Sequence, residues 1–135
     1  MIRVMIVDDN PIVVESLSKT VPWASVGCEL AATATDGETG LKTAREVRPD
    51  ILLLDIKMPG MDGLEMARRV LRETDTPPVL FIITSYAEFG YAQEAIKLGA
   101  VNYITKPIDN DDLLENLRIA AEKLLEERKS QDALE

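Results

Sequence analysis

The sequence predicts an α/β domain with a doubly wound, parallel sheet of five strands in the order 2-1-3-4-5 and with five helices. Short apolar runs alternate with longer amphipathic runs, which is the pattern of parallel strands joined by crossover helices. Three of the short runs are almost entirely apolar, as expected for strands that helices cover on both faces. The five expected strands are residues 3–7, 29–34, 51–54, 79–83 and 102–105.

The helices are expected between and after these strands. Val13, Leu17 and Val21 recur at helical spacing after Pro11, a residue suited to the first helical turn. Further helices are expected at residues 38–47, 63–72 and about 89–98, where Gly99 can serve as a left-handed cap. We expect Asn110 to cap the fifth helix, whose apolar stripe packs on the sheet: Leu113, Leu117, Ala121 and Leu124.

Composition indicates one globular domain. The 135 residues are 46% hydrophobic and 29% charged, so we expect a single domain at 1–126 and a polar helix end or linker at 127–135. The net charge of −9 argues against direct nucleic-acid binding. A single Cys28 and the lack of His argue against structural zinc and for a reducing compartment, with the cytoplasm as the expected location. The apolar start is interrupted at Asp8, too early for a membrane span.

Acidic side chains follow two of the expected strands. Asp8 and Asp9 come directly after the first strand, and Asp55 ends the third, so in this topology they converge on one crevice. Their mutual repulsion calls for a cation, and oxygen ligands suit a hard ion such as Mg²⁺ (or Mn²⁺). Thr84 ends the fourth strand and Lys106 follows the fifth, which adds a hydroxyl group and an ammonium group at the same edge.

Each of these residues has an ordinary structural interpretation when taken alone. Residues 8–11 could simply cap a helix, Asp55 could be a turn residue and Lys106 a surface charge. Their joint placement instead favours a phosphate pocket, because an aspartate can accept a phosphoryl group and the cations neutralise that group's charge.

The motifs at 7–10, 55–63, 84–85 and 106–107 together resemble, in order and spacing, the receiver-domain signature of two-component response regulators. The same strand order is flavodoxin-like. The resemblance implies that Asp55 accepts a phosphoryl group from a sensor histidine kinase, in a signalling domain that assists its own phosphorylation and is not a conventional enzyme. Asp8, Asp9, Asp55 and the Lys57 backbone carbonyl would hold the metal, and Lys106 and Thr84 would bind the phosphoryl group.

The resemblance also implies a switch. Tyr103 would turn inward as the Thr84 loop closes, although ordinary packing is an alternative role for Tyr103. This movement would alter the face formed by helix four, strand five and helix five, through which a homodimer could form. The family often has a cis peptide where this chain has Lys106-Pro107. Lys57 and Tyr86, unless they are plain surface residues, are expected to slow self-dephosphorylation.

Residues 85–92 and 21–23 resemble receivers linked to an AraC-type DNA-binding output domain, for which this chain has no room. Two enzymatic or carrier functions are disfavoured: a flavin carrier needs a Ser/Thr/Gly-rich phosphate loop where this chain has Asp8 and Asp9, and a haloacid-dehalogenase phosphatase needs a second Asp two residues after its nucleophile. A phosphorylation-independent interaction module is the remaining alternative, but such a module usually lacks one of the acceptor-site residues.

Overall fold

The five predicted strands form one parallel sheet. The computed structural model describes residues 1–85, 93, 97, 99 and 102–134. The strands are β1 (Ile2–Val7), β2 (Cys28–Ala34), β3 (Ile51–Asp55), β4 (Val79–Thr84) and β5 (Asn102–Thr105). They pair in the order β2-β1-β3-β4-β5, every pair being parallel. This confirms the predicted fold class and strand order.

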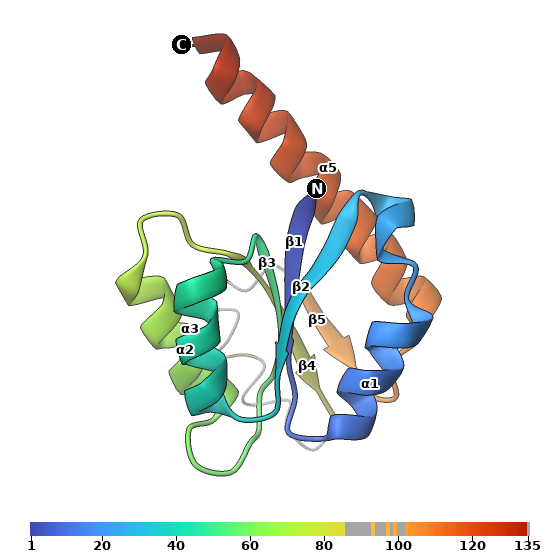
Figure 1. Ribbon diagram of the computed structural model, residues 1–135, viewed down its shortest axis with the longest axis vertical. Helices are drawn as coiled ribbons and strands as arrows, with labels where there is room; N and C mark the ends of the chain where they lie inside the picture. Colours follow the sequence, from blue (N-terminus) through green and yellow to red (C-terminus); the bar gives the residue numbers. More distant parts are fainter. Residues whose placement is uncertain (86–92, 94–96, 98, 100–101, 135) are drawn as a thin grey trace.

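Helices cover both faces of this sheet (Figure 1). Helices α1 (Pro11–Thr20) and α5 (Asn110–Leu134) lie on one face, and α2 (Gly37–Val47) and α3 (Gly63–Glu73) lie on the other. A short 3₁₀ helix, η1 (Trp23–Val26), follows α1 and was not predicted. Of the helix predicted at 89–98, the structure describes only residues 93 and 97, which are both helical. The backbone of Gly99 has the expected positive φ, +98°.

The sheet separates two apolar cores, and successive residues of the central strands contribute to opposite ones. On β3, Ile51 and Leu53 belong to the core shared with α1 and α5, whereas Leu52 and Leu54 belong to the core shared with α2 and α3. This alternation explains why β1, β3 and β4 are apolar at nearly every position. The predicted stripe of α5 is confirmed, since Leu113, Leu117 and Ala121 are buried and Leu124 packs against the same core.

Helices α1, α2 and α3 each begin with a short polar side chain that accepts a backbone hydrogen bond. Asn10 Oδ1 accepts from Ile12 N (3.0 Å), Asp36 Oδ1 from Thr39 N (2.7 Å) and Asp62 Oδ1 from Glu65 N (2.9 Å). Such caps satisfy amide groups that have no partner within the helix. The helix-cap interpretation of residues 8–11 therefore holds for Asn10.

The predicted cap of α5 was wrong by one residue. Asp109 Oδ1, not the Asn110 side chain, accepts hydrogen bonds from Asp111 N (2.9 Å) and Asp112 N (3.2 Å). Asn110 is the first helical residue, and its Nδ2 donates to Thr20 Oγ1 (2.8 Å) at the end of α1. The side chain of Asn110 therefore links two helices instead of capping one.

Helix α5 continues well past the sheet, to Leu134 (Figure 1). The segment at 127–134, predicted as a polar helix end or linker, is thus helical. Arg128 forms an ion pair and hydrogen bond with Asp50, at the amino end of β3. Among the described residues, no helix is long and apolar enough to cross a bilayer.

Candidate functional site

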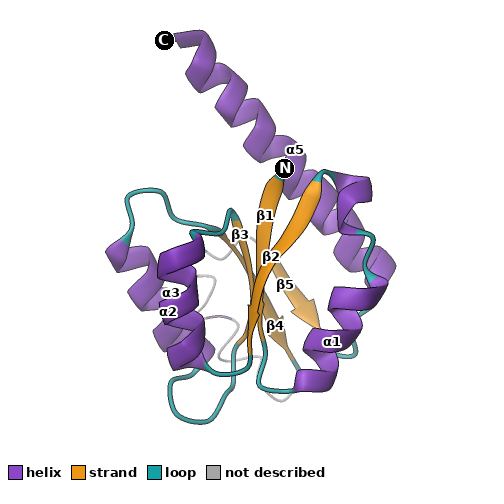
Figure 2. Cartoon of the chain, in the orientation of Figure 1, coloured by secondary structure: helices purple, strands orange, loops and turns teal. Residues whose placement is uncertain are grey.

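The candidate site lies at the carboxyl ends of the strands, where the loops run along the lower edge of the sheet in Figure 2. Asp8 follows β1, Asp55 and Thr84 end β3 and β4, and Lys106 follows β5. Asp8, Asp55 and Thr84 are buried, with 0%, 3% and 3% of their surface exposed. Buried carboxylates without compensating partners are costly, so their presence together needs an explanation.

Three carboxylates gather within reach of one ion. Asp8, Asp9 and Asp55 each offer an oxygen within 4.8 Å of the others, and only Asp9 is exposed. Asp8 Oδ1 accepts a hydrogen bond from Asn10 N (2.9 Å), but the buried Asp8 Oδ2 accepts none from the described residues. An oxygen-only donor set that includes a buried carboxylate oxygen without a hydrogen bond fits a hard divalent cation such as Mg²⁺.

Lys106 supplies the positive charge that the chain itself brings to this cluster. Its Nζ lies 3.1 Å from Asp8 Oδ2 and 3.5 Å from Asp55 Oδ2. Burial lowers the pKa of the Lys106 ammonium group, but the two carboxylates outweigh this effect and the pKa is raised. The Lys106 backbone is fixed by a hydrogen bond from its N to Thr84 O (2.8 Å), and the Lys106-Pro107 peptide is cis, as expected.

The Asp55 carboxyl group is strongly perturbed. Burial, followed by the negative charge of Asp8, raises the pKa of Asp55 to about 7, although Lys106 opposes the rise. The single positive charge of Lys106 therefore does not balance the negative charges of the Asp8 and Asp55 carboxylates. The arrangement favours either a proton or a bound cation near Asp55 at neutral pH.

Two glycines hold the loop between β3 and α3 close to its neighbours. A Cβ at Gly63 would lie 2.1 Å from Asp55 O, and a Cβ at Gly37 would lie 2.3 Å from Met61 O. Gly63 N also donates to Ile56 O (2.9 Å). The close approach at Gly37 was not predicted. Its signal was the Asp-Gly pair that begins both α2 and α3, where an Asp cap precedes a residue with no side chain.

The remaining predicted site residues are less tightly gathered. Thr84 Oγ1 donates to Ser85 O (3.1 Å). Lys57 is exposed, and its backbone N lies 3.4 Å from Asp55 Oδ1. Tyr103 is 47% exposed on β5. Tyr86 lies outside the described residues.

The chain matches the family model of the response regulator receiver domain over residues 4–118. It is 41% identical over 119 residues to the positive alginate biosynthesis regulatory protein of Pseudomonas aeruginosa, an alignment that covers 88% of this chain and 47% of that protein. It is 34% identical over 133 residues to the uncharacterized transcriptional regulatory protein YesN of Bacillus subtilis, covering 98% of this chain and 34% of that protein. The chain therefore spans less than half the length of either relative.

Solved structures give the same result. The REC domain of AraT, a response regulator from Geobacillus stearothermophilus, superposes with a TM-score of 0.86 at 39% identity, covering 93% of this chain and 97% of that domain. A two component transcriptional regulator AraC from Clostridium phytofermentans superposes with a TM-score of 0.84 at 27% identity, covering 95% and 98% of the respective chains. The likeness to each structure thus extends over more than nine-tenths of this chain.

Proposed function

This chain belongs to the response regulator receiver domain family, and from that premise we propose that Asp55 accepts a phosphoryl group from a sensor histidine kinase in a Mg²⁺-dependent reaction. The observation that carries the proposal is the convergence of Asp8, Asp9 and Asp55 with Lys106 at one edge of the sheet. Among the parts of the chain that the structure describes, only this edge places a cation beside a carboxylate whose negative charge is incompletely balanced.

Asp8, Asp9, Asp55 and the Lys57 backbone carbonyl are the ligands that we assign to the metal. The buried Asp8 Oδ2, which has an ion pair with Lys106 but accepts no hydrogen bond, supports this assignment. The raised pKa of Asp55 also supports it, because a nearby dication would favour the ionised carboxylate. When bound, the metal supplies charge neutralisation for the transferring phosphoryl group. Mn²⁺ could serve in place of Mg²⁺, because it accepts the same oxygen ligands.

The Asp55 carboxylate oxygen attacks the phosphorus atom, and the bond from phosphorus to the donor's leaving group breaks. With acetyl phosphate as the donor, acetate leaves and an acyl phosphate remains on Asp55. Lys106 lies 3.5 Å from Asp55 Oδ2 and can move its ammonium group onto a phosphoryl oxygen. The domain thus assists its own phosphorylation and needs little beyond alignment and charge neutralisation.

Thr84 and Tyr103 form the switch in this proposal. The Thr84 hydroxyl donates to Ser85 O in the structure and would turn to the new phosphoryl group. Tyr103, on the strand paired with β4, is half-exposed, and in this proposal its side chain turns inward as the Thr84 loop moves. The face of the fourth helix, β5 and α5 would change with it and would control an output domain or a homodimer contact.

The phosphoryl lifetime is assigned to Lys57 and Tyr86. An exposed Lys57 provides no base for an attacking water, and a bulky Tyr86 would cover the approach to the phosphorus atom. We therefore expect a long-lived phosphorylated state. Replacing Tyr86 with Ala and measuring the decay of phosphorylated protein tests this, and an unchanged lifetime contradicts it.

The proposed setting is a cytoplasmic two-component system in bacteria. The longer transcriptional regulatory protein YesN supports a covalently linked transcriptional output domain, and the likeness to the two component transcriptional regulator AraC supports an AraC-type one. The net charge of −9 leaves DNA contact to that output domain. We assign residues 1–126 to the receiver domain and the polar segment after them to the connection.

Incubation with acetyl phosphate and Mg²⁺, followed by intact-mass measurement, tests the function. The expected result is one phosphoryl adduct that requires Mg²⁺ and is absent from Asp55→Asn. Asp50→Asn is the matched control, because Asp50 lies at the other end of β3 and should leave the adduct unchanged. No Mg²⁺-dependent adduct, together with unaltered partner binding in Asp55→Asn, would favour a phosphorylation-independent interaction module.

A further inference from the structure

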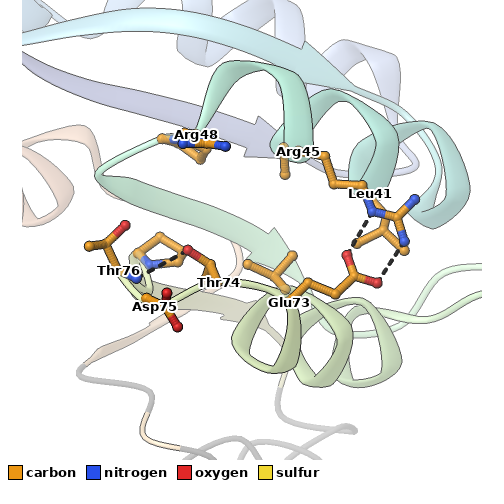
Figure 3. Close-up of a pocket in the computed structure, with 11 residues that line it drawn as sticks. Leu41, Arg45, Arg48, Glu73, Thr74, Asp75 and Thr76 are labelled. Atoms are coloured by element: carbon orange, nitrogen blue, oxygen red, sulfur yellow. Dashed lines mark hydrogen bonds and ion pairs between the residues drawn. The ribbon is translucent and has the colours of Figure 1, made fainter.

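A cleft opens between the C-terminal ends of α2 and α3, and we call it the α2–α3 cleft. It is lined by residues of 41–49 and 70–78 and has a volume of about 560 Å³, within the range of small-molecule sites. Its lining includes Pro49 and Pro78, which lie just before β3 and β4. The cleft is therefore at the amino-end edge of the sheet, opposite the edge that carries Asp55. Figure 3 shows this lining.

One end of the α2–α3 cleft is closed by an ion pair between the two helices. Arg45 Nε donates to Glu73 Oε2 (2.6 Å), and a second guanidinium nitrogen donates to Glu73 Oε1 (2.7 Å) (Figure 3). Two parallel hydrogen bonds fix the geometry of this wall. They also occupy both charges, so neither Arg45 nor Glu73 has charge to spare for a ligand.

Arg48 provides a second, unpaired guanidinium group. It caps the end of α2 with a φ of +50°, a left-handed conformation that normally favours glycine or asparagine. Within the described residues, no hydrogen bond or ion pair involves the Arg48 side chain, which lies on the α2 side of the cleft in Figure 3. An arginine at a position suited to glycine, without a partner of its own, is a candidate for ligand binding.

The rest of the lining is apolar with hydroxyl groups on one side. Leu41 and Val70 are 3% and 8% exposed and form an apolar floor. Thr74 Oγ1 accepts a hydrogen bond from Thr76 N (3.1 Å), so its own proton remains available to an acceptor. The exposed Asp75 also lines the cleft, but in Figure 3 its carboxylate is drawn below the loop, away from Arg48.

We propose that the α2–α3 cleft binds a small organic anion, a carboxylate on an apolar body, with the carboxylate on Arg48 and the Thr74 hydroxyl group. The guanidinium group offers paired donors that match a carboxylate, and the floor accepts the apolar part. The net charge of −9 opposes an anion at long range, but screening limits that effect to about 8 Å in physiological salt. Within the cleft, the unpaired positive charge of Arg48 then favours a negatively charged ligand.

Benzoate, with benzamide and acetate as matched probes, tests this site by amide chemical shifts in NMR. Benzoate is expected to shift residues 41–48 and 73–76 with a millimolar dissociation constant. Benzamide, which lacks the charge, and acetate, which lacks the ring, should each bind roughly tenfold more weakly. Binding should be the same with and without Mg²⁺, because the cleft and the carboxylate cluster are at opposite edges. A negative result for benzoate binding would therefore leave the proposed phosphorylation of Asp55 untouched, and a negative phosphorylation result would leave the cleft proposal untouched.

Arg48→Gln removes the guanidinium group while leaving a side chain that meets the same backbone constraint. It should weaken benzoate binding about tenfold. Lys42→Gln is the control, because Lys42 is an exposed cation of α2 outside the cleft lining, and it should bind benzoate as the unaltered chain does. Equal binding of benzoate and benzamide, unchanged binding in Arg48→Gln, or shifts confined to other parts of the chain would each overturn the proposal.

Discussion

Asp50 and Asp55 stand at the two ends of one strand, β3, and their surroundings differ. Asp50 Oδ2 accepts a hydrogen bond from Arg3 N (2.8 Å), and Asp50 Oδ1 accepts one from the Arg128 guanidinium group. Asp55 is more deeply buried and lies close to Asp8, and the same Lys106 ammonium group forms ion pairs with both carboxylates. The same residue type is thus satisfied by the chain at one end and under-compensated at the other.

The difference separates a structural carboxylate from one prepared for a ligand. The backbone at Asp50 also joins neighbouring strands, since its N donates to Arg3 O (2.8 Å) and its O accepts from Val79 N (2.9 Å). Asp50 therefore fastens the amino-end edge of the sheet. At Asp55 the chain leaves charge uncompensated, and a cation or a proton must supply the balance.

The largest expected effect is on how stability changes with pH. The folded-state pKa of Asp55 is raised to about 7 from 3.8, so between these values the unfolded chain holds fewer protons and stability falls as pH rises. Without metal, the unaltered protein should lose on the order of 2 kcal/mol more than Asp55→Asn between pH 5 and pH 8. Urea unfolding at several pH values measures this.

Saturating Mg²⁺ should remove most of that loss, because it favours the ionised Asp55. Asp50→Asn should retain the pH dependence of the unaltered protein, since Asp55 is intact in it. A pH dependence in Asp55→Asn equal to that of the unaltered protein would show that Asp55 is not under-compensated.

Removal of the Lys106 charge should have the next largest effect. Lys106→Met leaves Asp8 and Asp55 without their cation, and a cost of about 1–2 kcal/mol is expected in metal-free buffer at pH 8, because the side chain is partly exposed. Lys106→Arg keeps a charge and should cost less. Thermal unfolding of both variants measures the two losses of stability. Equal stabilities of Lys106→Met and Lys106→Arg would show that Lys106 stabilises the protein through packing and not through its charge.

Arg48→Gly should stabilise the protein. A residue with a Cβ is disfavoured at a φ of +50°, and glycine should relieve roughly 0.5–1 kcal/mol of that cost. Arg48→Ala removes the same side chain but keeps the Cβ, so it should not stabilise. Denaturant midpoints of the two variants compare them, and identical midpoints would argue against strain at this helix end.

The smallest expected effect is that of replacing Arg128, which forms an ion pair with Asp50. Arg128→Gln should cost less than about 1 kcal/mol, as is usual for exposed ion pairs, but it should release the last turns of α5. Hydrogen exchange of amides after residue 121 is expected to quicken, while Lys123→Gln leaves it unchanged. Unchanged exchange in Arg128→Gln would mean that this contact does not hold the helix.

Much of the fold and of the carboxylate cluster followed from the sequence. Three strands are apolar on both faces and end at polar residues, so a doubly wound parallel sheet could be predicted, although composition alone did not settle the strand order. In the expected order 2-1-3-4-5 the strand ends that carry Asp8, Asp9, Asp55 and Lys106 meet, as they do in the structure. The site depends on where parallel strands end, and short apolar runs mark those ends clearly.

Details that depend on the relative positions of separate elements were not predictable. Asp109 and Asn110 are both good helix caps, and only the register of α5 against α1 decides between them. The contact of Gly37 with Met61 and the pairing of Arg128 with Asp50 join residues far apart in sequence. Such contacts depend on how helices pack against their neighbours. The apolar periodicity of a helix indicates which face is buried, but it leaves the position of the helix along its neighbour undetermined by a turn or more.

The most direct test of the central claim is to locate the phosphoryl group itself. The protein is incubated with acetyl phosphate and Mg²⁺, the acyl phosphate is reduced with borohydride, and the modified residue is identified by peptide sequencing. The account predicts modification at Asp55 alone, and only when Mg²⁺ is present. Modification at Asp50 or another acidic residue, or modification of Asp55 to the same extent without a divalent cation, would contradict it.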